Sequence, residues 1–192
     1  MTIELPTPQQ LKEVADQLGL NLDDEDVETF RGLMGPNIEA FNQVDDMPDE
    51  LPLVKYPREP GYRPEPEDNP LNGWYYKTSI KGADDGKLSG RSVALKDNIM
   101  LAGVPMMNGS ATLEGYVPEV DATLVERILD AGGEIAGKSS CEFFCLSGGS
   151  HTNSTGPTHN PYRHGFSAGG SSSGSAALVS SGSVDMAVGG DQ

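Results

Sequence analysis

A glycine- and serine-rich segment, residues 165–183, leads directly into apolar sequence and is the part of the chain best suited to chemistry. Small residues let main-chain N–H groups approach a ligand closely. The serines supply hydroxyl groups, but a serine hydroxyl is a poor nucleophile at neutral pH and needs a base. The histidines, His151, His159 and His164, all precede this segment, so a triad in the order Ser, Asp, His would need a histidine further along the chain.

Lysine is the alternative base, provided that burial keeps its amine unprotonated. The run Ser92-Val-Ala-Leu-Lys96 is typical of a strand, and its alternation places Ser92, Ala94 and Lys96 on one face. Lys96 then lies at the end of the strand, where α/β sheets gather their functional groups. For a lysine considered alone, an exposed place at a strand-to-turn boundary is the commoner outcome.

Three blocks of sequence carry more specific information. They are Lys96-Asp-Asn98 with the glycines after it, Gly137-Lys-Ser-Ser-Cys-Glu142, and Gly169-Gly-Ser-Ser-Ser173-Gly-Ser-Ala-Ala177 followed by Gly189-Gly-Asp-Gln192. In this order and spacing the blocks resemble the amidase signature family, and the resemblance covers residues 89–192 almost continuously. The match departs from the usual pattern at Ser173, where glycine is common.

That resemblance implies roles for individual residues. Lys96 would be the base, and Ser171 would relay a proton between Lys96 and a nucleophilic serine expected just beyond Gln192, outside this chain. The N–H of Gln192 would help to hold the oxyanion of the tetrahedral intermediate, and Asp191 would orient its loop. Cys145 begins a glycine-rich turn that we expect to line the same pocket.

The implied activity is hydrolysis of a carboxylic amide to the acid and ammonia, through an acyl-enzyme, by a Ser-Ser-Lys mechanism without a cofactor. Among members of the family, the bacterial amidases of nitrile and amide breakdown are the most similar. An alternative is a glutaminase-like component of an amidotransferase, which would supply ammonia to a partner protein. A third possibility is a non-catalytic fragment that retains the scaffold.

Competing motifs are weaker. Residues 170–174 fit G-x-S-x-G, but no apolar strand precedes them as a nucleophile elbow requires. Residues 169–174 have the spacing of a phosphate-binding loop, yet Ser175 stands where its lysine should be. Cys141 and Cys145 are better explained as buried reduced thiols than as metal ligands, and the histidines show no ligand spacing, so no metal is predicted.

The elements around the candidate site predict an α/β fold, with a mixed, mostly parallel sheet between helices and a small N-terminal helical domain before it. Residues 1–87 are expected to form the helical and proline-rich extension, and residues 88–192 the N-terminal part of an incomplete catalytic domain. Residues 176–179 favour a helical turn, and residues 184–188 a short strand.

Capping and breaking residues divide the extension. Thr7-Pro8 predicts a helix start, and Gly19 closes that helix. The acidic run at residues 23–26 favours a second helix, which Gly35-Pro36 should interrupt. Seven prolines from Pro48 to Pro70 make a long helix or central strand unfavourable, so an extended path is expected there.

Composition limits the partners. The formal net charge of −16 repels nucleic acid and anionic membranes, so neither is predicted as a direct partner. The sequence shows no basic, apolar leader and no apolar run that could span a bilayer, and its two cysteines do not suggest a disulfide framework. We therefore expect a cytoplasmic protein that takes a small-molecule amide. The acidic extension is either a solvated cover or a contact between protomers, and a homodimer is expected.

Overall fold

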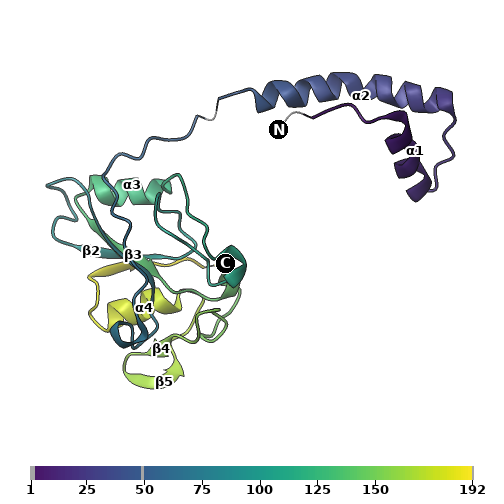
Figure 1. Ribbon diagram of the computed structural model, residues 1–192. Coiled ribbons are helices and arrows are strands. Elements are labelled where there is room, and N and C mark those ends of the chain that lie inside the picture. Colours follow the sequence, from purple (N-terminus) through teal and green to yellow (C-terminus); the bar gives the residue numbers. More distant parts are fainter. Residues whose placement is uncertain (1–2, 49, 192) are drawn as a thin grey trace. The chain divides into compact units, whose positions relative to one another are not determined.

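The computed structural model describes residues 3–48 and 50–191, and the chain forms two compact units, Met1–Glu50 and Leu51–Gln192 (Figure 1). The first unit consists of helices α1 (Pro8–Gln17) and α2 (Asp24–Asp45). The side chain of Thr7 accepts a hydrogen bond from the N–H of Gln10, and the Gln10 side chain accepts one from the N–H of Thr7. This reciprocal cap confirms the helix start predicted at Thr7-Pro8.

Helix α2 corrects a prediction about its middle. We expected Gly35-Pro36 to interrupt it, but the helix continues through Pro36 to Asp45. Proline removes one main-chain hydrogen bond and its ring crowds the carbonyl group one turn earlier, but these local costs do not end the helix here. The strong start, where Asp23 caps the N–H of Asp26, also favours the continuous helix.

The second unit is built on a four-stranded sheet with the order β1-β3-β2-β6. Its strands are β1 (Trp74–Lys81), β2 (Ser92–Lys96), β3 (Glu134–Ser139) and β6 (Met186–Val188). Strand β2 runs parallel to both β3 and β6, and β1 is antiparallel to β3, so the sheet is mixed and mostly parallel as predicted. A hairpin of β4 (His159–Asn160) and β5 (Arg163–Ser167) lies outside this sheet.

Helices α3 (Thr123–Asp130) and α4 (Ser173–Ser180) cover opposite faces of the sheet (Figure 1). Val93 and Leu95 of β2 pack with α3 in one buried cluster, while Ala94, between them, joins Leu178 of α4 in another. The alternation predicted from the sequence of β2 is therefore confirmed. Burial of both clusters fixes the register of β2, because a slip by one residue would exchange its faces.

The division between the units differs from our expectation. We placed the start of the catalytic domain near Leu88, whereas the second compact unit begins at Leu51. Residues 51–87 belong to it because β1 pairs along β3, and because Tyr62 exchanges main-chain hydrogen bonds with Lys77 of β1. Short 3₁₀ turns, Pro66–Asp68, Ala111–Leu113 and Phe143–Cys145, complete the fold. Across the described part of the chain, no helix has the length and apolar character needed to cross a bilayer.

Candidate active site

The side chain of Lys96 lies at the C-terminal end of β2 and is completely buried. Its Nζ donates to Ser171 Oγ at 2.7 Å and to the carbonyl oxygen of Gly190 at 2.9 Å. The parallel pairing of β2 with β6 brings Lys96 close to Gly190, and the hydrogen bonds between Ser172 and Gly190 hold the Ser171 loop at the same place. Both oxygens lack a formal charge, so the amine is held in place without a carboxylate at either contact. The structure thus joins the predicted base to the predicted relay serine.

Ser171 lies in the loop before α4, after a cis peptide bond between Gly170 and Ser171. A Cβ atom at Gly170 would lie only 2.0 Å from the carbonyl oxygen of Gly149, so no larger residue fits there without movement. Ser172 fixes the next contact, because its hydroxyl donates to the carbonyl oxygen of Gly190 and accepts from the N–H of Gly190. The loop therefore holds both oxygens that face Lys96.

A small hollow of about 180 Å³ opens beside Ser171. Its lining comes from the end of the last 3₁₀ turn and the residues after it, and from the loops before α4 and after β6: Cys145, Leu146, Ser147, Gly148, Gly170, Ser171 and Asp191. Cys145 and Asp191, both named from the sequence, therefore lie at the same hollow as Ser171. The thiol of Cys145 donates to Asn108 Oδ1 at 3.1 Å. Gln192, the remaining predicted site residue, falls outside the described residues.

The sequence analysis assigned no role to a buried ion pair that lies next to Lys96, between Asp97 and Lys138. Asp97, next to Lys96, places its Oδ1 2.9 Å from Nζ of Lys138 on β3, and both side chains are almost fully buried. The other carboxylate oxygen accepts the N–H groups of Met107 and Asn108. Burial raises the pKa of Asp97 and lowers the pKa of Lys138, so each charge depends on its partner. In the sequence, Asp97 directly follows one strand and Lys138 lies near the end of another, and neither position shows that the two residues pair.

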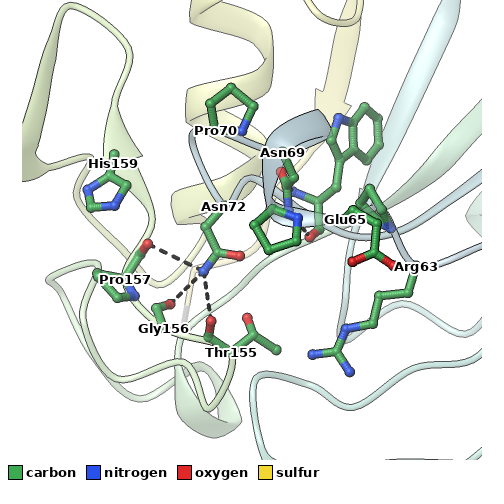
Figure 2. A pocket seen from close by; sticks show the side chains of 12 residues that line it. Arg63, Glu65, Asn69, Pro70, Asn72, Thr155, Gly156, Pro157 and His159 are labelled. Atoms are coloured by element: carbon green, nitrogen blue, oxygen red, sulfur yellow. Dashed lines mark hydrogen bonds between the residues drawn. The ribbon is translucent and has the colours of Figure 1, made fainter.

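A second hollow, shown in Figure 2, lies between the loop before β1 and residues 155–159. Asn72 Nδ2 donates to the carbonyl oxygens of Thr155, Gly156 and Pro157 at 3.2, 2.9 and 3.3 Å, so its amide ties the two loops together. Arg63, at the rim, forms an ion pair with Glu114. The residues lining this hollow include no serine or cysteine nucleophile beside a base, which makes the Lys96 site the better candidate for chemistry.

The described histidine, cysteine, aspartate and glutamate side chains form no group of three that could hold a metal ion. The rings of His159 and His164 lie 4.0 Å apart on the β4–β5 hairpin, and His164 Nε2 contacts the carbonyl oxygen of Pro70. Cys141 and Cys145 are buried free thiols, as expected. Burial raises the pKa of the Cys141 thiol, which disfavours a reactive thiolate there.

Comparisons with known proteins find similar sequences. The family model described as Amidase matches residues 74–192. An enantioselective amidase from Rhodococcus rhodochrous is 49% identical over 174 residues, which cover 84% of this chain and 34% of that protein. A glutamyl-tRNA(Gln) amidotransferase component from Haloarcula marismortui is 48% identical over 120 residues, which cover 62% of this chain and 28% of that protein.

Solved structures extend the likeness to the fold. The crystal structure of the corresponding glutamyl-tRNA(Gln) amidotransferase component from Thermotoga maritima matches with a TM-score of 0.59 at 33% identity, over 63% of this chain and 27% of that one. The present chain therefore spans roughly a third or less of the length of the relatives it matches.

Proposed function

Because this chain belongs to the amidase family, we propose that the complete protein hydrolyses carboxylic amides to the acid and ammonia through an acyl-enzyme. The observation that carries the proposal is the contact of 2.7 Å between the buried Lys96 amine and Ser171 Oγ. A base beside a hydroxyl on a rigid loop is the arrangement that a proton relay needs.

In the proposed mechanism, Lys96 accepts the proton of Ser171 Oγ, and Ser171 takes the proton of a nucleophilic serine downstream of Gln192. That serine attacks the amide carbon, and the C–O bond forms as the carbonyl electrons move to the oxyanion. The C–N bond then breaks while the proton returns through Ser171 to the nitrogen, which leaves as ammonia. Water cleaves the acyl-enzyme through the same relay and releases the acid.

We assign three further residues to the same site. The N–H of Gln192 stabilises the oxyanion, Asp191 orients the loop that carries it, and Cys145 forms part of the acyl-binding wall. Support comes from the hollow that Cys145 and Asp191 share with Ser171. The hollow is small and its lining is mainly small residues, so the rest of the acyl pocket must come from other parts of the complete protein.

A second candidate function follows from the relatives named as components of an amidotransferase. In that case the site would release ammonia from glutamine for a partner protein. The higher coverage by the enantioselective amidase, 84% against 62% of this chain, favours the free-standing amidase.

Assays of the purified complete protein without any partner separate the two functions. We would measure ammonia release from aliphatic amides, aromatic amides and glutamine, and trap the acyl-enzyme by acid quenching for mass spectrometry. The amidase predicts turnover of simple amides and a mass increase equal to the acyl group. Turnover of glutamine alone, rising when a partner protein is added, would instead establish the amidotransferase function.

We also propose that the complete protein is a homodimer. Helix α2 leaves Leu33, Phe41 and Val44 exposed on one side, and burying such a stripe stabilises an oligomer. Sedimentation equilibrium of the same preparation measures the mass directly, and a monomer at micromolar concentration would contradict the proposal.

A further inference from the structure

We propose that Glu142 is a positioning residue for Ser171, and that Ser173 holds Glu142 in the required place. This inference rests on the proposed function, in which Ser171 relays the proton. Glu142 follows β3, and its side chain has no exposed surface. Its main-chain N–H donates to the carbonyl oxygen of Ser171 at 3.1 Å, so Glu142 contacts the relay residue directly.

The carboxylate of Glu142 connects the loops on either side of the site. Oε2 accepts the N–H and the hydroxyl of Thr152 at 2.8 and 2.7 Å, and Oε1 accepts the hydroxyl of Ser173 at 2.9 Å. Hydrogen bonds to a charged acceptor are stronger than those between neutral groups. Glu142 therefore links the loop after the Cys145 turn to the first residue of α4, two positions beyond Ser171.

The stem of Glu142 sets the position of the residue before Ser171. A Cβ atom at Gly170 would lie 2.9 Å from Glu142 Cγ, so the main chain at Gly170 is packed against this side chain. Glu142 thus restrains Ser171 from both sides: through packing at Gly170 and through the hydrogen bond to the Ser171 carbonyl. A change in the Glu142 side chain would shift Ser171 Oγ relative to Lys96 Nζ.

Ser173 supplies the hydroxyl that donates to Oε1 of Glu142. The sequence has serine where the related pattern commonly has glycine, and a glycine would supply no hydroxyl to Oε1. The Ser173 side chain is fully buried, so no solvent replaces the lost donor when it is removed. The other hydrogen bond of its hydroxyl within the described residues is a long one, 3.4 Å, to Thr158 Oγ1.

The test compares Ser173→Ala with Ser140→Ala in the complete protein. Ser140 is a matched control, because its hydroxyl is also buried but has no hydrogen-bond partner among the described residues. Loss of a hydrogen bond to a buried charged group corresponds to about a tenfold effect, so we expect Ser173→Ala to lower kcat for a simple amide about tenfold. We expect Ser140→Ala to retain the activity, and the KM to stay unchanged in both variants.

An activated ester supplies the readout that a merely structural role would not move. A p-nitrophenolate leaving group departs without a proton, whereas an amine must receive one from the relay. Displacement of Ser171 should therefore lower the rate with the amide more than the rate with a p-nitrophenyl ester of the same acid. Equal losses on both substrates would mean that Ser173→Ala damages the site in general, and would overturn the inference.

Substitutions of Glu142 separate position from charge. In Glu142→Gln the amide oxygen can still accept from Thr152, while its NH₂ group donates to the hydroxyl of Ser173, which can rotate. We expect Glu142→Gln to keep kcat within about threefold of the unmodified protein, and Glu142→Ala to lose more than tenfold. The exposed Glu119→Ala serves as the control. Equal losses of kcat in the Gln and Ala variants would overturn the positioning role of Glu142. This test remains valid even if Ser173→Ala does not fold.

Lys96→Ala, measured in parallel, separates a failure of the proposed relay from a failure of the positioning role of Glu142. If Lys96→Ala remains active, the proposed relay itself is wrong. If Lys96→Ala is inactive while Ser173→Ala and Glu142→Ala behave like the unmodified protein, the relay stands and the positioning role of Glu142 is wrong.

Discussion

Replacement of Asp97 by asparagine, a side chain of nearly the same size and shape, should strongly destabilise the second unit. Asp97 and Lys138 are 1% and 0% exposed, and their ion pair measures 2.9 Å. In Asp97→Asn the amide oxygen can keep the N–H groups of Met107 and Asn108, but the NH₂ group then faces the Lys138 ammonium. A donor meets a donor, and a buried cation loses its only ion-pair partner among the described residues.

Breaking a buried pair by removing one partner costs about 3–5 kcal/mol. With a urea dependence of about 2 kcal/mol/M, the midpoint of unfolding should fall by about 2 M. The assay is equilibrium urea unfolding of the complete protein, followed by circular dichroism, for Asp97→Asn, Lys138→Met and the double variant. Because the double variant has no charge at these two positions, its loss should be smaller than the sum of the single losses by on the order of 2–3 kcal/mol. Additive losses would refute the reasoning.

Two further predictions concern the site loop and the sheet edge. Ser171→Ala should lower kcat by roughly 10²–10⁴-fold, as expected when a proton-transfer group is removed. Ser172→Ala should lower kcat less, because Ser172 acts only by holding Gly190. Equal losses of kcat in steady-state kinetics would contradict the relay role of Ser171. The N–H and hydroxyl of Ser92, with Arg91, lower the pKa of Asp185 to about 2. Because the pKa of Asp185 is lower in the folded state, its ionised carboxylate stabilises the fold above the unfolded pKa of about 4, and this stabilisation is lost as the pH falls toward 2. The thermal midpoints of Asp185→Asn and the unmodified protein should therefore converge from pH 6 to pH 3. A constant difference between the two midpoints would contradict this prediction.

Local sequence signals predicted the elements whose stability is local. Thr7-Pro8 marked the start of α1, and the alternating run 92–96 matches β2 residue for residue. The helix and strand expected near residues 176–179 and 184–188 correspond to α4 and β6. Because β2 was placed correctly, its last residue, Lys96, could be singled out before any tertiary contact was known.

What the sequence could not predict depends on contacts between distant segments. The pairing of Asp97 with Lys138 requires the register of β2 against β3, which no local pattern contains. The sequence gives Glu142 no role of its own, and only the three hydrogen-bond donors around its buried carboxylate reveal its place. The start of the second unit was missed for the same reason, since β1 joins the sheet through pairing with β3, which follows it by more than fifty residues.

The central claim is that Lys96 acts as the base of an amide-hydrolysing relay, and the kinetics of Lys96→Ala in the complete protein test it most directly. The matched control is Lys77→Ala, which changes a lysine on β1 that is not at the site. Our account predicts that Lys96→Ala loses at least about 10²-fold in kcat for a simple amide, with an unchanged circular dichroism spectrum, and that Lys77→Ala retains its activity. Amide turnover by a folded Lys96→Ala variant at a rate near that of the unmodified protein would contradict the account.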